Sequence, residues 1–221
     1  MPPELSFHLL TDARDPAFGD VLSIYCEAFP DDQRMSHGRI ANLLDRRAMH
    51  ITACASGGEI VGFSACLRPA GHAFAWLEYF AVRRGLRGGG IGSALFRWTA
   101  ATATSGAAGM LLEIEPPETA PNDADRRLRV TRLNFYQRLG CLVLIDFPYQ
   151  MWTASGDVPM QLLLYPGAAP GPATAADRSR LYALIHGAVA DRRRFYLAAS
   201  AEWRQQQIRA GSDATRPQQE G

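Results

Sequence analysis

The residues with the clearest chemical potential form a glycine-rich loop in the middle of the chain. Arg87 is followed by four glycines within five positions and then by the apolar stripe of a predicted helix. The first N–H groups of a helix have no internal acceptor, and the helix dipole favours negative charge there. Glycine lets the backbone approach a ligand, and the arginine adds a cation. The loop therefore predicts a phosphate or pyrophosphate site, formed by Arg87, Gly88, Gly89, Gly90, Ile91, Gly92 and Ser93.

Two common nucleotide-binding motifs do not fit this loop. A P-loop requires Gly-Lys-Ser/Thr at its end, and that tripeptide is absent. A dinucleotide fingerprint requires Gly-x-Gly-x-x-Gly, but Leu95 stands at the third glycine position when the frame starts at Gly90, and Ser93 stands there when it starts at Gly88. A nucleotide-binding oxidoreductase is therefore disfavoured. The remaining alternative is a tight turn at a helix start that binds no ligand.

Glu78 is the first of three glutamates that could move protons. It lies in the aromatic-rich segment 73–82, which is typical of a buried strand. Strand alternation predicts that Glu78 shares a face with Trp76 and Phe80. A carboxylate in such a place could attract the ammonium form of an amine and then accept a proton, directly or through water. The alternative is an ordinary buried ion pair.

Glu113 and Glu115 are the other two glutamates, and they share one face of the predicted strand 109–115. Two acids on a central strand are costly to bury unless they meet water, a cation or each other. They could line a pocket for the acceptor substrate, and Glu115, nearer the carboxyl end of the strand, is the preferred candidate. They could also face solvent, or form salt bridges to the arginine-rich segment 126–132. Three acids in one cleft would favour a cationic amine as substrate.

Strands and helices alternate around these residues. The loop joins the strand 73–82 to a helix that begins near Ile91, and Asn122 or Asp123 could cap a helix that ends at Leu139. The remaining predicted elements are the strand 5–10, the helix 15–29, a helix capped by Ser36, a hairpin of 50–55 and 59–68, and the strands 109–115, 141–152 (interrupted at Pro148) and 159–165.

The composition changes after the last predicted strand. Residues 166–176 are rich in proline, glycine and alanine and predict a linker. Residues 177–210 have an amphipathic pattern that predicts a helical extension, and 211–221 predict a disordered tail. The extension could cover the acceptor site or mediate a homodimer. Its run of three arginines, 192–194, is interpreted as a surface feature rather than a nucleic-acid site.

The overall composition excludes several classes of protein. The 221 residues carry a formal net charge of +1, which gives no general case for nucleic-acid or membrane partners. No apolar run approaches the length of a bilayer span, and no signal peptide is visible. The four cysteines are scattered, as expected of core residues in a reducing compartment, and the dispersed histidines do not form a metal motif. We therefore expect a cytoplasmic protein without a metal.

Two motifs make the chain resemble a known family. Arg87, Gly90 and Gly92 form the pattern Arg-x-x-Gly-x-Gly behind a strand that ends in Ala-Val, which resembles the acetyl-CoA loop of the GNAT superfamily of N-acyltransferases. Further along, the segment 134–140 (Asn-Phe-Tyr-Gln-Arg-Leu-Gly) looks like the family's Phe-Tyr-x-x-x-Gly signature. The order of the predicted elements over 5–165 is also that of a GNAT domain. Arg129 stands where many members have an asparagine.

The resemblance implies an α/β fold over residues 1–165, with a mixed, mostly antiparallel twisted sheet of about seven strands flanked by helices. It implies that the pyrophosphate of acetyl-CoA binds the N–H groups of Gly88 to Ser93, with Arg87 alongside. The pantetheine arm would pair with the backbone of Phe80, Ala81 and Val82, and the thioester would lie where the strands 73–82 and 109–115 diverge. The Tyr136 hydroxyl would point at the sulfur and protonate the leaving thiolate.

We therefore predict an acetyl-CoA-dependent N-acetyltransferase. The primary amine of a small molecule or peptide would attack the thioester directly in a ternary complex. Glu78 and Tyr136 would be catalytic, and Glu113 and Glu115 would bind the substrate. The alternatives are a longer acyl-CoA, a hydroxyl acceptor, or a non-catalytic module that binds CoA.

Overall fold

The computed structural model describes residues 4–68, 72–153, 156–166 and 175–214. Its strands are β1 (Leu5–Leu9), β2 (Met49–Ser56), β3 (Glu59–Leu67), β4 (Phe74–Val82), β5 (Gly109–Ile114), β6 (Leu142–Val143), β7 (Tyr149–Thr153) and β8 (Gly156–Tyr165). Its helices are α1 (Phe18–Ala28), α2 (His37–Asp45), α3 (Ile91–Ala103), α4 (Asp123–Arg138) and α5 (Ala175–Ala214), with short 3-10 turns η1 (Asp31–Gln33), η2 (Arg84–Leu86) and η3 (Pro117–Thr119). Ser36 caps α2, as the sequence predicts, and Asn122 is the one of the two predicted candidates that caps α4.

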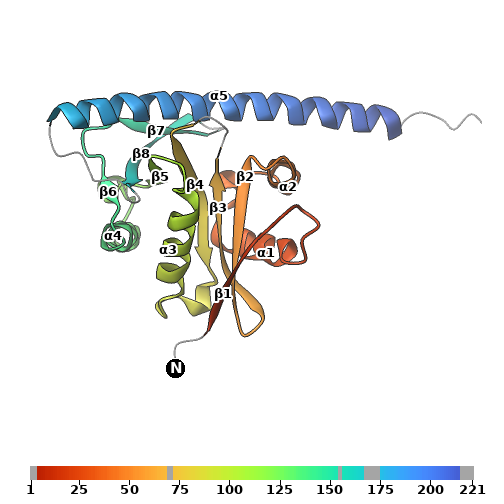
Figure 1. The fold of residues 1–221 in the computed structure, drawn as a ribbon, viewed down its shortest axis with the longest axis horizontal. Coiled ribbons are helices and arrows are strands. Elements are labelled where there is room, and N and C mark those ends of the chain that lie inside the picture. Colours follow the sequence, from red (N-terminus) through yellow and green to blue (C-terminus); the bar gives the residue numbers. More distant parts are fainter. Residues whose placement is uncertain (1–3, 69–71, 154–155, 167–174, 215–221) are drawn as a thin grey trace, which may run out of the picture.

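A single mixed sheet forms the centre of the domain (Figure 1). Among the described residues it has eight strands in the order β1-β2-β3-β4-β5-β8-β6, and β7 pairs with the first half of β8. β4 and β5 are parallel, and the other neighbouring pairs are antiparallel. The predicted mixed, mostly antiparallel α/β fold is therefore confirmed.

The helices cover both faces of this sheet. One face is buried by α1, α2 and part of α5, over a core that includes Phe63, Phe74 and Trp76. The other face is buried by α3 and α4, over residues such as Met110 and Leu112. Figure 1 shows α1 and α2 on one side of the sheet and α3 and α4 on the other. Any side chain at the sheet centre is therefore shielded from both sides.

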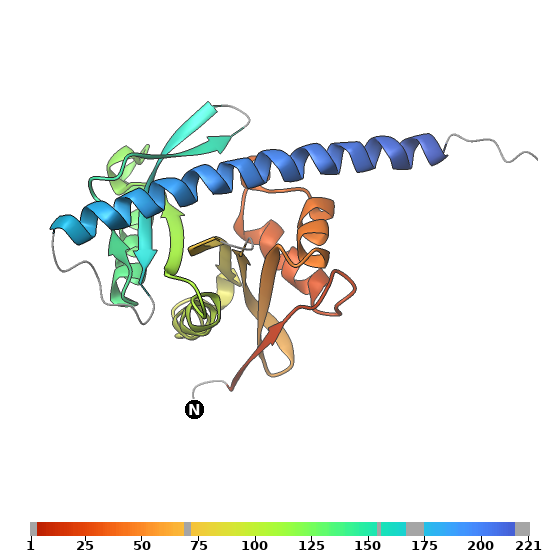
Figure 2. The same cartoon turned by 45° about the horizontal axis from the view of Figure 1, so that its top comes forward.

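The C-terminal helix α5 runs across the domain and extends beyond it (Figures 1 and 2). It is one continuous helix that continues past position 210 to Ala214, and its residues Ile185 and Ala188 are buried in the main core. Residues 167–174 of the predicted linker and 215–221 of the predicted tail lie outside the described residues. No helix in the described ranges combines the length and apolarity needed to span a bilayer.

β4 and β5 stop pairing midway along β4. Their last paired residues are Leu77 and Leu112, so Glu78 and Glu113 are the first residues beyond the ladder. The pairing of β4 with β3 also shifts there, because Ala65 pairs with Tyr79 whereas Cys66 pairs with Leu77. Glu78 is therefore the extra residue of a β-bulge. The two strands therefore diverge beyond Leu77 and Leu112.

The bulge corrects one prediction about strand faces. Trp76 packs in the core beneath α1, α2 and α5, and Tyr79 packs against the same core. Phe80 instead contacts Phe96 and Phe135 on the opposite face. Glu78 does not share a face with both Trp76 and Phe80, as strict alternation predicts, because one inserted residue reverses the alternation.

The predicted strand 141–152 is two short strands, β6 and β7, joined by a turn. Within the turn the Phe147 N–H donates to the Leu144 carbonyl at 3.3 Å. Pro148 follows, and it has no N–H to continue a ladder. The two strands pair with different halves of β8. The turn between them brings Phe147 and Tyr149 into the core beneath α5.

Candidate active site

The glycine loop ends where α3 begins, next to the last residue of β4. Gly88 and Gly90 have φ values of +91° and +84°, a left-handed conformation that other residues rarely adopt. Within the described chain, the backbone N–H groups of the four residues 90–93 make no hydrogen bond, whereas the Ala94 N–H donates to the Gly90 carbonyl at 3.1 Å. A Cβ added at Gly90 would meet no atom within 4 Å. The loop therefore has several backbone donors without a partner in the described chain, as an anion site requires.

Arg87 and Gly92 connect this loop to its surroundings. The Arg87 Nε donates to the Val82 carbonyl at 3.2 Å, which ties the arginine to the end of β4. A Cβ added at Gly92 would lie 3.6 Å from the Phe135 ring and 3.7 Å from a Val82 methyl group. The start of α3 thus packs against both β4 and α4.

The segment Phe80, Ala81 and Val82 forms the free side of β4. These three residues pair with Ser64, Phe63 and Gly62 of β3. On the side of β5 they have no paired strand, because that ladder ends at Leu77. A strand with one unpaired side can accept an extended ligand by main-chain hydrogen bonds. The predicted pantetheine segment therefore has an unpaired backbone side, and its role stays a prediction.

Tyr136 lies near the end of α4, on the α3 side of the sheet. It is 7% exposed and packs edge-on against Phe135, Phe96 and Phe80, with ring centroids 5.1, 5.5 and 6.5 Å away. Its hydroxyl makes no hydrogen bond to another described residue. Burial raises the pKa of the phenol, so Tyr136 stays protonated well above neutral pH. A protonated phenol without a partner can donate to a nearby anion.

Glu78 takes part in a buried ion pair with Arg192 of α5. The Arg192 Nε and Nη2 donate to its two carboxylate oxygens at 2.7 and 2.8 Å, and the Tyr196 hydroxyl donates to Oε2 at 2.6 Å. The side chains of Glu78 and Arg192 are 5% and 6% exposed. The sequence leaves a free base and a buried ion pair as alternatives for Glu78, and the structure contains the ion pair.

Glu113 lies across the divergence from Glu78 and binds the same guanidinium. Arg192 Nη2 and Nη1 donate to its carboxylate at 3.1 and 3.3 Å, and Nη1 also donates to the Tyr149 hydroxyl at 2.6 Å. The guanidinium lies 4.5 Å from the centroid of the Trp76 ring, a cation–π distance. Burial alone would lower the pKa of Arg192, but Glu113 and Glu78 raise it well above its ordinary value. The cluster therefore holds two carboxylates and one permanent cation.

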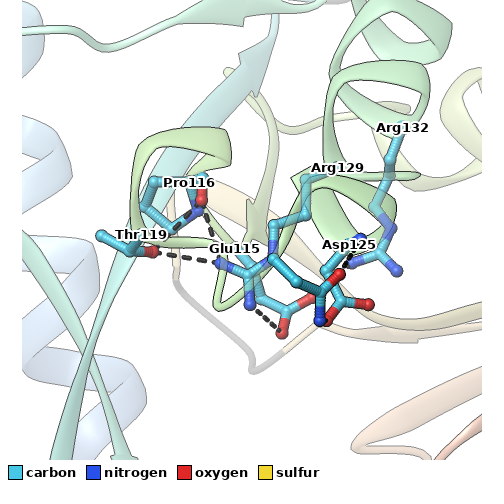
Figure 3. Close-up of polar contacts among 7 residues, drawn as sticks. Glu115, Pro116, Thr119, Asp125, Arg129 and Arg132 are labelled. Carbon is cyan, nitrogen blue, oxygen red and sulfur yellow. Dashed lines mark hydrogen bonds and ion pairs between the residues drawn. The ribbon is translucent and has the colours of Figure 1, made fainter. Parts of the chain in front are cut away.

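Glu115 is directed to a different place from Glu113. It binds Arg129 at 3.2 Å and Arg132 at 2.9 Å, both from α4 (Figure 3). Arg129 also donates to the Pro116 carbonyl and to the Thr119 hydroxyl, at 3.0 and 3.1 Å. The predicted salt-bridge alternative is therefore the one present for Glu115. Arg129, where family members often carry an asparagine, fastens the end of β5 to α4.

Arg192, Tyr196 and Tyr149 are the site residues that sequence reasoning missed. Arg192 belongs to a run of three arginines that the sequence interprets as surface charge, but it is buried while Arg193 and Arg194 are exposed. The available signal was spacing: Ile185, Ala188 and Arg192 follow one face of α5 at helical intervals. Among the described residues, no group of three or more His, Cys, Asp or Glu side chains could hold a metal ion.

Comparisons with known proteins agree with this geometry. Residues 47–140 match the family model described as the acetyltransferase (GNAT) domain, and they include the glycine loop, both diverging strands and Tyr136. None of the curated proteins compared with the chain matches it significantly.

Several solved structures share the fold. A GNAT-family protein from Bacteroides thetaiotaomicron is similar with a TM-score of 0.61 and 21% identity, covering 83% of this chain and 97% of that one. An aminoglycoside 6'-N-acetyltransferase solved with coenzyme A has a TM-score of 0.57 and 17% identity, covering 76% and 99%. The ribosomal-protein-S18-alanine N-acetyltransferase from Escherichia coli has a TM-score of 0.52 and 18% identity, covering 77% and 99%. Residues 47–140 thus match the GNAT acetyltransferase domain, and the chain shares the fold of these solved structures.

Proposed function

We propose that the protein is an acetyl-CoA-dependent N-acetyltransferase that acts on the primary amine of a small molecule or peptide. The observation that carries the proposal is the alignment of three features: unpaired N–H groups at the start of α3, the free side of β4, and the divergence of β4 from β5. Together they offer one continuous path for a pyrophosphate, an extended pantetheine arm and a thioester. The similar aminoglycoside acetyltransferase was solved with coenzyme A, which supports the same ligand here.

In this proposal the loop residues hold the pyrophosphate. Donors at a helix N-terminus favour such a charge. The unpaired backbone of Phe80, Ala81 and Val82 holds the pantetheine arm. One of their N–H groups faces the thioester oxygen and stabilises the negative charge that develops on it.

The amine then attacks the thioester carbon, so that a C–N bond forms and the C–S bond breaks. An alkylamine with a pKa near 10.4 is protonated at neutral pH, and its neutral form costs about 4–5 kcal/mol. The carboxylates Glu78 and Glu113 attract the ammonium group, and its proton leaves to this pair directly or through water. Tyr136, whose phenol burial keeps protonated at neutral pH, gives its proton to the departing thiolate.

A second candidate, a CoA-binding module without catalysis, is favoured by one observation. Glu78 already accepts three hydrogen bonds, so its lone pairs are largely used before any amine arrives. The cluster could then serve only to fix α5 on the domain. Longer acyl-CoA donors and hydroxyl acceptors remain alternatives for the chemistry.

Release of free CoA thiol distinguishes these candidates. The purified chain is mixed with acetyl-CoA and a panel of acceptors: a monoamine, a diamine, an aminoglycoside, a peptide with a free N-terminus, and an alcohol of matched size. The proposal predicts amine-dependent release with formation of the acetylamide. Release with the alcohol alone, or with longer acyl-CoA alone, would support the corresponding alternative. Tight binding of acetyl-CoA without release in any arm would support the non-catalytic module.

A further inference from the structure

The two glutamates at the strand divergence pose an electrostatic problem that helix α5 solves. Glu78 and Glu113 are each the first residue beyond the β4–β5 ladder, and their side chains are only 5% and 15% exposed. Two carboxylates held together in such surroundings repel each other strongly unless a cation lies between them. No cation is present in the nearby stretches of β4 and β5. The cation comes instead from Arg192, which lies 114 positions after Glu78 and 79 positions after Glu113 in the chain.

Arg192 is the cation between the two carboxylates, and it uses all of its hydrogen-bond donors there. A guanidinium has five N–H groups in one plane. Arg192 makes five hydrogen bonds: two to Glu78, two to Glu113 and one to Tyr149. Because each N–H has an acceptor, the plane of the guanidinium and both carboxylates fix one another. Lysine could not reproduce this arrangement, since its ammonium has three donors around a point.

Two aromatic rings lie close to the guanidinium. The Trp76 ring lies 4.5 Å from it and the Tyr196 ring 5.4 Å. Tyr196, one helical turn after Arg192, also donates its hydroxyl to Glu78. The next layer comes from α2, where Arg39 donates to the Tyr196 carbonyl at 3.3 Å and stacks on its ring. Strands, α2 and α5 therefore converge on one arginine.

We propose that Arg192 and Tyr196 position the carboxylates of Glu78 and Glu113 for the acceptor, and that α5 thereby belongs to the active site. The inference rests on the proposed acetyl transfer. Arg192 fixes the two carboxylates on either side of the opening between β4 and β5. It also reduces their combined charge from two negative charges to one, which matches an acceptor with a single ammonium group. Glu113, more exposed and held by longer bonds than Glu78, is the carboxylate that faces the acceptor.

Steady-state kinetics of Arg192→Ala, Arg192→Lys and Tyr196→Phe test this inference. Misplacement of reacting groups by about 1 Å can reduce the rate about 100-fold. We expect Arg192→Ala to lower kcat/KM for the amine by about that factor, with the dissociation constant of acetyl-CoA nearly unchanged because the loop is built from other elements. Arg192→Lys should recover only part of the loss. Added guanidinium ion should raise the activity of Arg192→Ala and saturate, whereas it should not raise that of the wild type.

A control variant, Arg193→Ala, and the variant Tyr196→Phe make the test independent of whether Arg192→Ala folds. Arg193→Ala changes the exposed neighbour on the same helix and should behave as the wild type. Tyr196→Phe keeps every charge, so it serves if Arg192→Ala does not fold, and it should lower kcat by about tenfold without changing acetyl-CoA binding. Unchanged amine kinetics in folded Arg192→Ala, or in Tyr196→Phe when the first variant is unfolded, would overturn the inference. An inactive wild type would instead show that the proposed function itself is wrong.

Discussion

The two candidate ligand sites of this domain, the glycine loop and the acidic cluster, are built in opposite ways. The loop uses consecutive residues and backbone donors, and it leaves those donors without partners inside the described chain. The acidic cluster, defined here as Glu78, Glu113, Tyr149, Arg192 and Tyr196, uses side chains from β4, β5, β7 and α5, and they satisfy one another. The loop has free donors for a ligand, whereas the acidic cluster already contains a cation, Arg192, that binds its carboxylates. A backbone site needs only local sequence, but a side-chain site of this kind needs the complete fold.

The largest expected effect separates the acidic cluster from the other glutamate–arginine contact of the domain. Arg192→Met leaves two buried carboxylates without their cation and should lower the free energy of unfolding by about 3–5 kcal/mol. Arg132 is the matched control, because its side chain is 48% exposed and its partner Glu115 is 33% exposed. Arg132→Met should cost less than about 1 kcal/mol. Urea unfolding measures both, and equal losses would show that the cluster is not specially dependent on Arg192.

The next effect tests whether the loop binds a ligand through its backbone. Gly90 and Gly58 have nearly equal φ values of +84° and +86°, and a Cβ at either would meet no atom within 4 Å. Valine at both positions imposes similar backbone strain, of about 1–3 kcal/mol. Gly90→Val should weaken acetyl-CoA binding by about 100-fold, while Gly58→Val in the β2–β3 turn should leave it unchanged. If calorimetry finds the same affinity in both variants, the loop is only a turn.

Tyr136→Phe should have a moderate effect on turnover and none on the loop. A thiol with a pKa near 8.5 is a fair leaving group without help, so we expect kcat to fall by about 10- to 100-fold. Acetyl-CoA binding should not change, since only a hydroxyl is removed from a ring held by three aromatic neighbours. Single-turnover kinetics would check the assignment, and an unchanged rate of acetyl transfer would remove Tyr136 from the chemistry.

The smallest effect concerns the reactivity of two buried thiols, Cys66 and Cys54, compared with that of the exposed thiol of Cys26. Burial raises the pKa of the Cys66 thiol to about 12, with Glu78 adding to the rise, and burial raises that of Cys54 to about 11. Thiolate is the reactive form, so at pH 8 both should react far more slowly than exposed Cys26. Their rates should keep rising with pH beyond 9, because the thiolate fraction of both is still small there. Mass spectrometry of alkylated peptides would measure these rates. Rapid labelling of Cys66 in the wild type would contradict the closed cluster.

Local features of the fold could be predicted because their causes are local. The caps at Ser36 and Asn122, the glycine loop and the order of strands all follow from short patterns. The bulge at Glu78 could not be predicted, because it arises from a mismatch in pairing with β3 that alternation does not reveal. One inserted residue moved Phe80 to the other face and changed the surroundings expected for Glu78.

The partner of Glu78 and Glu113 lay beyond local sequence for the same reason, whereas the partners of Glu115 did not. Glu115 pairs with arginines that follow it closely in the chain, and the sequence offered that pairing as an alternative. Glu78 and Glu113 pair with Arg192, whose run of three arginines is typical of a solvated surface. Only the packing of α5 on the core selects which arginine of the run is buried. The identity of an ion pair between distant elements is thus a property of tertiary structure.

The most direct test of the central claim is the thermal stability of the wild-type protein with acetyl-CoA, with ATP and NADH as controls. A ligand at about 100 times its dissociation constant adds about 2.7 kcal/mol of stability. For a domain of this size that corresponds to a rise in melting temperature of about 5–10 °C. The account predicts this rise with acetyl-CoA, its absence with the two controls, and its loss in Gly90→Val. No rise with acetyl-CoA or with longer acyl-CoA thioesters would contradict the assignment of the loop, and with it the proposed acetyl transfer.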